Sequence, residues 1–101
     1  MSRSSRNFHE RFLEDFANNL NQSEHVVLRT LYERSGGPIT VDQISSVTTL
    51  SRHRIYAALM NLRRLKFVTT ETGGRINREV ASCRVGVSIT GEGRTYMAHR
   101  P

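Results

Sequence analysis

The segment from Ser51 to Lys66 (SRHRIYAALMNLRRLK) constrains this chain most, because it combines an apolar stripe at helical spacing with strong positive charge. It contains five basic residues and no acidic one, and it accounts for most of the formal net charge of +6. A helix of this kind buries its apolar face and presents its cations to an anionic partner. Charge concentrated in this way is the electrostatic footprint of a nucleic-acid contact.

The length and composition indicate one globular domain over residues 1–101. A chain of 101 residues has the size of a typical domain with one modest core. Hydrophobic residues at 37% and charged residues at 24% are typical of globular rather than disordered proteins. No apolar run approaches the length of a membrane span, and the first residues lack the apolar core of a secretory signal. We therefore expect a cytoplasmic protein that does not associate with a membrane.

The residues that usually carry catalysis or bind metals form no recognisable set in this sequence. Cys83 is the only cysteine, which excludes an internal disulfide, and we interpret it as a small filler residue on a strand. A redox-sensing thiol beside Arg84 is the alternative. The four histidines have no ligand spacing, and no nucleophile–base pair, paired carboxylates or phosphate-binding glycine loop is present. We expect no metal, no cofactor and no enzymatic activity.

Two helices are expected before the central part of the chain. Residues 5–20 place three phenylalanines on one helical stripe, and we expect part of this stripe to contact a second subunit. Packing over its own domain is the alternative. Ser23 is expected to cap a second helix over residues 24–35, which Gly36-Gly37-Pro38 ends. The proposed dimer contacts are Phe8, Phe12 and Phe16, and the second helix should bury Val27, Leu28 and Leu31.

A short helix precedes the basic segment at close spacing. Thr40 is expected to cap a helix over residues 41–48, which turns Val41, Ile44 and Val47 inward. Ser51 then caps the basic helix, so only three or four residues separate the two helices. Two helices joined by so short a turn, the second of them basic, are the pattern of a helix-turn-helix.

The periodicity changes from helical to alternating after Phe67. Residues 67–72 and 84–90 are rich in β-branched residues and predict two strands of a hairpin. The polar, glycine-led stretch between them (GGRINREVASC) is expected to be an exposed basic loop. Thr90 should cap a last short helix over residues 91–100, whose Tyr96 and Met97 fold back on the core. The predicted fold is therefore α+β, with an N-terminal helix (1–22), a helical core (23–66), a hairpin (67–90) and a C-terminal helix (91–101).

This order of elements resembles the winged helix-turn-helix domain of the MarR/PadR-like transcriptional regulators. Two stretches carry the likeness, HVVLRTLYERSGGPITVDQISSVTTLSRHRIYAALMNLRRLKFV and VSITGEGRTYM, and together they span roughly residues 23–97. The resemblance implies three to four helices, a two-stranded hairpin wing, a short C-terminal helix and a homodimer. Lys66 departs from the pattern, because the family usually has glycine at this left-handed position.

Helix-turn-helix docking brings the N-terminal half of the second helix to the base edges of DNA. We therefore expect four residues to read bases and a further group to contact the backbone or an adenine. Arg52 and Arg54 are the strongest evidence for a DNA contact. The helix dipole disfavours cations at the N-terminal end, so their presence there indicates an anionic partner. Arg63 and Lys66 are cations at the other end of the helix. They either contact an anion or only complement the helix C-terminus, where the dipole favours cations. The candidate base readers are Arg52, His53, Arg54 and Ala57, and the other candidate contacts are Ser51, Tyr56, Asn61, Arg64, Arg75, Arg78 and Arg84.

The sequence thus predicts sequence-specific binding to double-stranded DNA by a homodimeric transcriptional repressor. A partition, replication or architectural DNA-binding protein of the same fold is one alternative. A winged helix used as a protein-interaction module is another. No feature of the sequence indicates a small-molecule effector.

Overall fold

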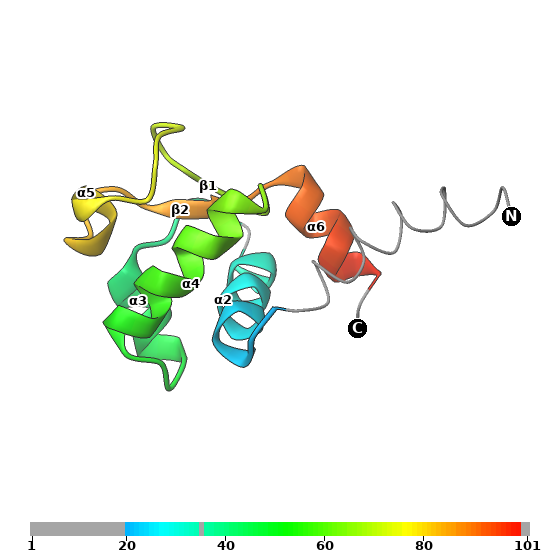
Figure 1. Ribbon diagram of the computed structural model, residues 1–101, viewed down its shortest axis with the longest axis horizontal. Helices are drawn as coiled ribbons and strands as arrows, with labels where there is room; N and C mark the ends of the chain where they lie inside the picture. The colour runs from blue at the N-terminus through cyan, green and yellow to red at the C-terminus, as the bar shows by residue number, and fades with distance from the viewer. Residues whose placement is uncertain (1–19, 35, 100–101) are drawn as a thin grey trace, which may run out of the picture.

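The computed structural model describes residues 20–34 and 36–99, which form an α+β domain (Figure 1). Five helices and one two-stranded antiparallel sheet lie within these residues. Helices α2 to α4 come first, a short helix α5 lies between the strands, and helix α6 follows the second strand. The elements are α2 (Gln22–Glu33), α3 (Val41–Val47), α4 (Arg52–Arg64), β1 (Val68–Thr70), α5 (Arg78–Ala81), β2 (Val87–Ile89) and α6 (Gly91–Ala98).

Helix α4 packs against both α2 and α3, and this packing forms most of the core (Figure 1). The apolar stripes that the sequence predicts for these helices are buried. The exception is Val47, which is 45% exposed because α3 ends there, after only Val41 and Ile44 have reached the core. The fully buried residues of the three helices are Val27, Leu28, Leu31, Val41, Ile44, Ile55, Ala58, Leu59 and Leu62.

Capping residues determine where the helices begin. Thr40 and Ser51 cap α3 and α4 as predicted. The prediction for α2 was wrong by two residues, because Asn21 rather than Ser23 is its N-cap. Asn21 and Glu24 form a capping box, in which each side chain accepts a hydrogen bond from the backbone N–H of the other (2.8 and 3.1 Å). This reciprocal pair satisfies two N–H groups where Ser23 would satisfy one.

The two strands pair antiparallel, with Val68 opposite Ile89 and Thr70 opposite Val87. Both strands are three residues long and therefore shorter than the predicted ranges. Ile39 extends the sheet by a single bridge, in which it exchanges two backbone hydrogen bonds of 2.8 Å with Val87. Ile39 thus ties the segment before α3 to the sheet.

The connection between the strands, residues 71–86, is not the exposed loop that the sequence predicts. Asn77 caps the helix α5, and Ile76 and Val80 are buried against the body of the domain. Cys83 lies after α5 in the left-handed region (φ 64°), so its interpretation as a strand residue was also wrong. We call residues 71–86 the β1–β2 connection below.

The last helix returns to the point where α4 ends. Thr90 donates a hydrogen bond to the Lys66 carbonyl (2.6 Å) and accepts one from the Gly93 backbone (3.0 Å). The Tyr96 ring stacks on Phe67 with 4.9 Å between centroids, and Met97 is buried. The predicted return of Tyr96 and Met97 to the core is confirmed.

Candidate nucleic-acid interface

Helix α4 divides into a buried and an exposed face. Ile55, Ala58, Leu59 and Leu62 are buried at helical spacing. The opposite side is exposed along its whole length, and the first turn of the helix contains no acidic residue. The exposed residues are Arg52, His53, Arg54, Ala57, Met60 and Arg64. All four expected base readers therefore lie on one accessible surface.

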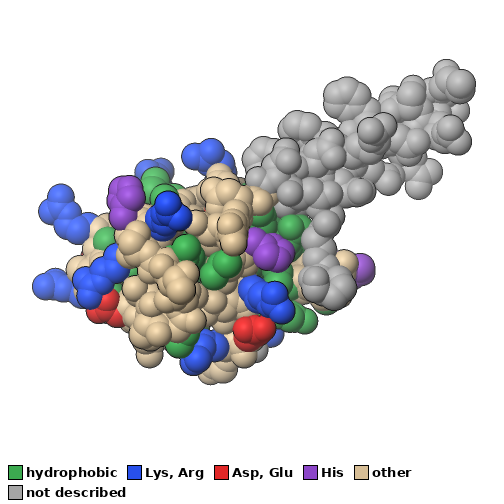
Figure 2. All heavy atoms as spheres, turned by 90° about the horizontal axis from the view of Figure 1, so that it is seen from below, with side chains coloured by type: hydrophobic (Ala, Val, Ile, Leu, Met, Phe, Trp, Pro, Cys, Tyr) green, Lys and Arg blue, Asp and Glu red, His purple; other side chains and the backbone are tan. Residues whose placement is uncertain are grey.

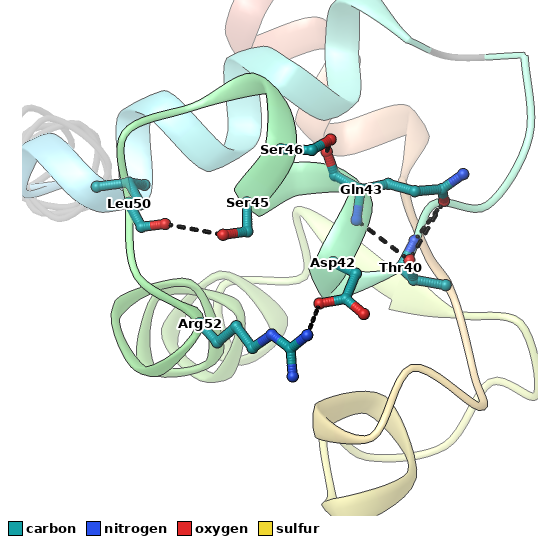
Figure 3. A network of polar contacts seen from close by, with 7 residues as sticks. All are labelled: Thr40, Asp42, Gln43, Ser45, Ser46, Leu50 and Arg52. Carbon is teal, nitrogen blue, oxygen red and sulfur yellow. Dashed lines mark hydrogen bonds and ion pairs between the residues drawn. The ribbon is translucent and has the colours of Figure 1, made fainter.

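Arg52 is not an unpaired cation. Its guanidinium forms an ion pair with Asp42 in the first turn of α3, across the turn that joins the two helices (Figure 3). Both side chains remain accessible, at 65% for Arg52 and 49% for Asp42. The ion pair thus holds Arg52 in place without covering the surface of α4.

Arg54 lies two residues further along and has no such partner. Within residues 20–34 and 36–99, the ion pairs are Arg52–Asp42 and Arg29–Glu33. The backbone N–H of Arg54 donates to the Ser51 hydroxyl oxygen (3.2 Å), and the residue as a whole is exposed. A cation in the first turn of a helix is disfavoured by the dipole, so its side chain has no internal reason to be there.

Two expected contact residues are engaged inside the domain instead. Asn61 donates from Nδ2 to the buried Glu24 carboxylate (2.8 Å), which joins α4 to the start of α2. The Tyr56 hydroxyl donates to the Ile76 carbonyl (3.4 Å) and so joins α4 to the β1–β2 connection. The packing of α2 and of the connection on α4 directs both side chains inward, so the contacts expected of Asn61 and Tyr56 are replaced by hydrogen bonds within the domain.

The three arginines expected on the wing are all exposed, but they lie on a structured connection. Arg75 precedes the buried Ile76, Arg78 is the first residue of α5, and Arg84 follows the left-handed Cys83. Their backbone is fixed at the base, where Gly86 N–H donates to the Glu71 carboxylate (2.6 Å). These cations therefore have defined positions relative to α4.

The C-terminal half of α4 and the β1–β2 connection enclose a groove of about 560 Å³. Four of its six lining residues are cations and none is acidic. The lining residues are Met60, Arg63, Arg64, Lys66, Arg75 and Ile76, and we call this the basic groove. A smaller hollow of about 250 Å³ lies at the other end of α4, where His53, Arg54 and Ala57 face the start of α2.

Positive charge dominates the accessible surface. Figure 2 shows one face of the domain, on which Lys and Arg side chains outnumber Asp and Glu side chains.

Among the described residues, no three His, Cys, Asp or Glu side chains come together as metal ligands. No helix in that part of the chain is long and apolar enough to cross a membrane. The expected dimer contacts Phe8, Phe12 and Phe16 lie outside the described residues.

Sequence reasoning missed Asp42 and the basic groove as parts of this surface. From local sequence alone, Asp42 is an acid in the first turn of a helix, where it complements the helix dipole. Its pairing with Arg52 depends on the turn between the two helices. For Arg63 and Lys66, the sequence leaves open whether they contact an anion or complement the helix C-terminus. The run of basic residues that ends α4 was a signal for the groove, but its opposite wall comes from a distant loop.

Comparisons with known proteins add no relative. Neither the models of protein families, nor the curated proteins, nor the solved structures contain a match to this chain.

Proposed function

We propose that this chain is a winged helix-turn-helix protein that binds double-stranded DNA in a sequence-specific manner. In this assignment α3 and α4 are the helix-turn-helix and the β1–β2 connection is the wing. The observation that carries the proposal is the exposed Arg54 in the first turn of α4, with no acidic partner among the described residues and against the helix dipole. DNA phosphates and guanine edges are the ligands that such a cation matches.

The N-terminal half of α4 is the part proposed to enter the major groove. Arg54 would bond guanine O6 and N7 through both arms of its guanidinium, while Ala57 allows close approach to the bases. His53 lies beside them on the same exposed face, and Arg52 is held next to it by Asp42. Ser51, Arg64, Arg75, Arg78 and Arg84 are assigned to the phosphate backbone.

The proposed regulatory role is repression by a homodimer that occupies a pseudo-palindromic site. Two copies of α4 would then lie in successive major grooves about 34–36 Å apart. The spacing of Phe8, Phe12 and Phe16 in the sequence supports this proposal, because it predicts an apolar stripe that an apolar partner would cover.

The test is selection of bound sequences from a random duplex pool at about 150 mM salt, followed by affinity measurements on the recovered site. We expect one enriched motif with two-fold symmetry. Arg54→Ala should weaken binding to that site by about 1–3 kcal/mol and relax the preference at one base pair. Arg94→Ala on the exposed surface of α6 is the matched control and should have little effect.

The other outcomes are equally clear. Binding without an enriched motif would favour the architectural or partition role over a repressor. Unchanged binding after Arg52 and Arg54 are both replaced by alanine would contradict the proposed interface. A salt-resistant complex with an acidic protein, with no duplex binding at low salt, would favour the protein-interaction module.

A further inference from the structure

The basic groove lies at the end of α4 away from the proposed base readers. It brings together Arg63, Arg64 and Lys66 from one wall and Arg75 from the other, with no acidic residue in the lining. We propose that it is a preformed binding site for a single phosphate group and that it binds one phosphodiester of the DNA backbone. This inference rests on the proposed function for the source of the phosphate, but the site itself follows from the groove.

The end of α4 does not need these cations to satisfy its backbone. The Phe67 N–H donates to the Leu62 carbonyl and the Lys66 N–H to the Arg63 carbonyl, both at 3.0 Å. These two bonds form a Schellman motif, which closes the helix with backbone groups alone. The Lys66 carbonyl in turn accepts a hydrogen bond from Thr90. The side chains of Arg63, Arg64 and Lys66 therefore remain available to a ligand.

Lys66 occupies a backbone conformation that favours glycine. Its φ angle is 66°, at the position of the Schellman motif where a residue without Cβ is preferred. Strained positions held by a non-glycine residue occur most often where the side chain has a function. Lys66 lines the basic groove, so a role for its charge in that groove would account for the strain.

Arg63 has a donor that no group in the domain satisfies. Its Nε is buried and lacks a hydrogen-bond partner within the described part of the chain. A buried donor without an acceptor destabilises the conformation that holds it. A phosphate in the groove, on turning the guanidinium outward, would accept from Nε and one Nη together, the two-bond geometry that guanidinium groups make with phosphate.

The opposite wall is fixed relative to α4. Ile76 is buried, and its carbonyl accepts a hydrogen bond from Tyr56, which is a residue of α4 itself. Arg75 is the neighbouring residue and so faces the helix from a defined position. Met60 and Ile76 add apolar surface that suits the sugar carbons beside a phosphodiester. Cations on both walls, with one wall joined to α4 by a hydrogen bond, suit a localised anion such as a phosphate group.

The experiment combines protein variants with a DNA duplex that carries a single neutral methylphosphonate, moved one position at a time. Arg63→Gln removes both the positive charge and the two-bond donor geometry of the guanidinium, whereas Arg63→Lys keeps only the charge. Arg75→Gln tests the other wall at an exposed position, in case the first variant fails to fold. Arg94→Gln, on α6 and outside the groove, is the matched control. Thermal unfolding of each variant checks folding.

We expect one methylphosphonate position to weaken the wild-type protein about tenfold, with no further loss when Arg63→Gln is combined with it. Arg63→Gln and Arg75→Gln should each weaken binding and reduce its salt slope by at most about 1, the share of one phosphate, and Arg63→Lys should retain the slope but lose affinity. Arg94→Gln should change affinity less than twofold. Tight binding by both groove variants, with the same methylphosphonate sensitivity as wild type, would overturn the inference and leave the proposed function standing.

A second measurement separates the two proposals. Sodium pyrophosphate should raise the unfolding temperature of the wild type above that in sodium chloride of equal ionic strength, and should not do so for Arg63→Gln. If duplex DNA fails to bind but pyrophosphate gives this pattern, the phosphate site stands and the proposed DNA function fails. If Arg63→Gln changes neither the affinity for duplex DNA nor the stabilisation by pyrophosphate, the inference is overturned. Stronger protection by polyglutamate than by pyrophosphate would overturn it in favour of an acidic protein surface.

Discussion

At the scale of single residues, Arg52 and Arg54 differ in what surrounds their charge. Arg52 pairs with Asp42 on the neighbouring helix, whereas Arg54 has no acidic partner in the described residues. An exposed ion pair contributes little to stability, so its clearest effect is on where the guanidinium points. The carboxylate of Asp42 also repels any phosphate that approaches Arg52. If α4 binds DNA as proposed, Asp42 limits how strongly this end of the helix attracts it.

Replacing Asp42 by asparagine should free Arg52 and remove this repulsion. We expect Asp42→Asn to increase affinity for duplexes of any sequence by about two- to fivefold, while the preference for the selected site falls. Fluorescence anisotropy with specific and unrelated duplexes over a range of salt concentrations measures both quantities. Glu92→Gln is the control, because Glu92 is also an acid in a first helical turn but lies on α6. An unaltered affinity for unrelated DNA would contradict the role given to Asp42.

Lys66 shows the opposite relation between stability and charge. Its left-handed backbone should cost the fold about 1 kcal/mol relative to glycine. Lys66→Gly is therefore expected to raise the free energy of unfolding by up to about that amount, as measured by urea titration, while it weakens binding to phosphate. Lys66→Gln keeps the Cβ atom and should lose the binding without the gain in stability. A destabilised glycine variant would show that Lys66 is not strained.

At the scale of elements, the β1–β2 connection behaves as part of the core rather than as a free loop. The sequence stretch that follows Gly73 is polar, yet two of its apolar residues, Ile76 and Val80, fold under the connection and are buried. Helix α5 lies against α4, and the Tyr56 hydrogen bond joins the two segments. The positions of the connection arginines relative to α4 depend on this packing.

Val80→Ala tests whether the packing of α5 fixes the connection. Removal of two methyl groups from a fully buried position should cost about 2 kcal/mol. We also expect hydrogen exchange to become faster in residues 76–86 before it does in α4, because the connection loses its anchor. Val47→Ala, at a position that is 45% exposed, should change stability by less than about 0.5 kcal/mol. Exchange that accelerates equally in α4 would show that the connection has no separate stability.

At the scale of the whole molecule, the chain closes where α4, β1 and α6 meet. The ends of these elements converge in the ribbon (Figure 1). Thr90 joins the end of α4 to the start of α6, and Phe67 stacks on Tyr96. Gly93 makes this approach possible, since a Cβ atom there would collide with the Phe67 carbonyl oxygen and lie 2.7 Å from Ile89 Cγ1. The second glycine of the stretch VSITGEGRTYM is thus explained by contact between segments distant in sequence.

Gly93→Ala should therefore force α6 away from the strands. We expect a loss of about 1–3 kcal/mol in the free energy of unfolding, because the colliding atoms belong to backbone and to a buried side chain. Gly91→Ala, in the same turn but with open space around it, should be neutral or slightly stabilising. Thermal and urea unfolding of the two variants provide the comparison. Equal effects of the two substitutions would contradict the close approach at Gly93.

The sequence alone determined the features that depend on neighbours a few residues apart. The helical stripes, the caps at Thr40 and Ser51, and the short turn between α3 and α4 all follow from local spacing, because helical hydrogen bonds and caps join residues within one turn. The resemblance to the winged-helix pattern marked position 66 as one where the backbone is usually left-handed, and Lys66 has that conformation. The same local logic missed the Asn21 cap only because two capping residues competed at one helix start.

Tertiary structure decided which of the polar residues remain available for a partner. The pairing of Asn61 with Glu24, of Tyr56 with Ile76 and of Arg52 with Asp42 joins residues from different elements. Such contacts depend on the angle and depth at which elements pack, which no spacing in the sequence encodes. The basic groove also depends on tertiary packing. One wall is the end of α4, and the other is the β1–β2 connection, whose position depends on the burial of Ile76.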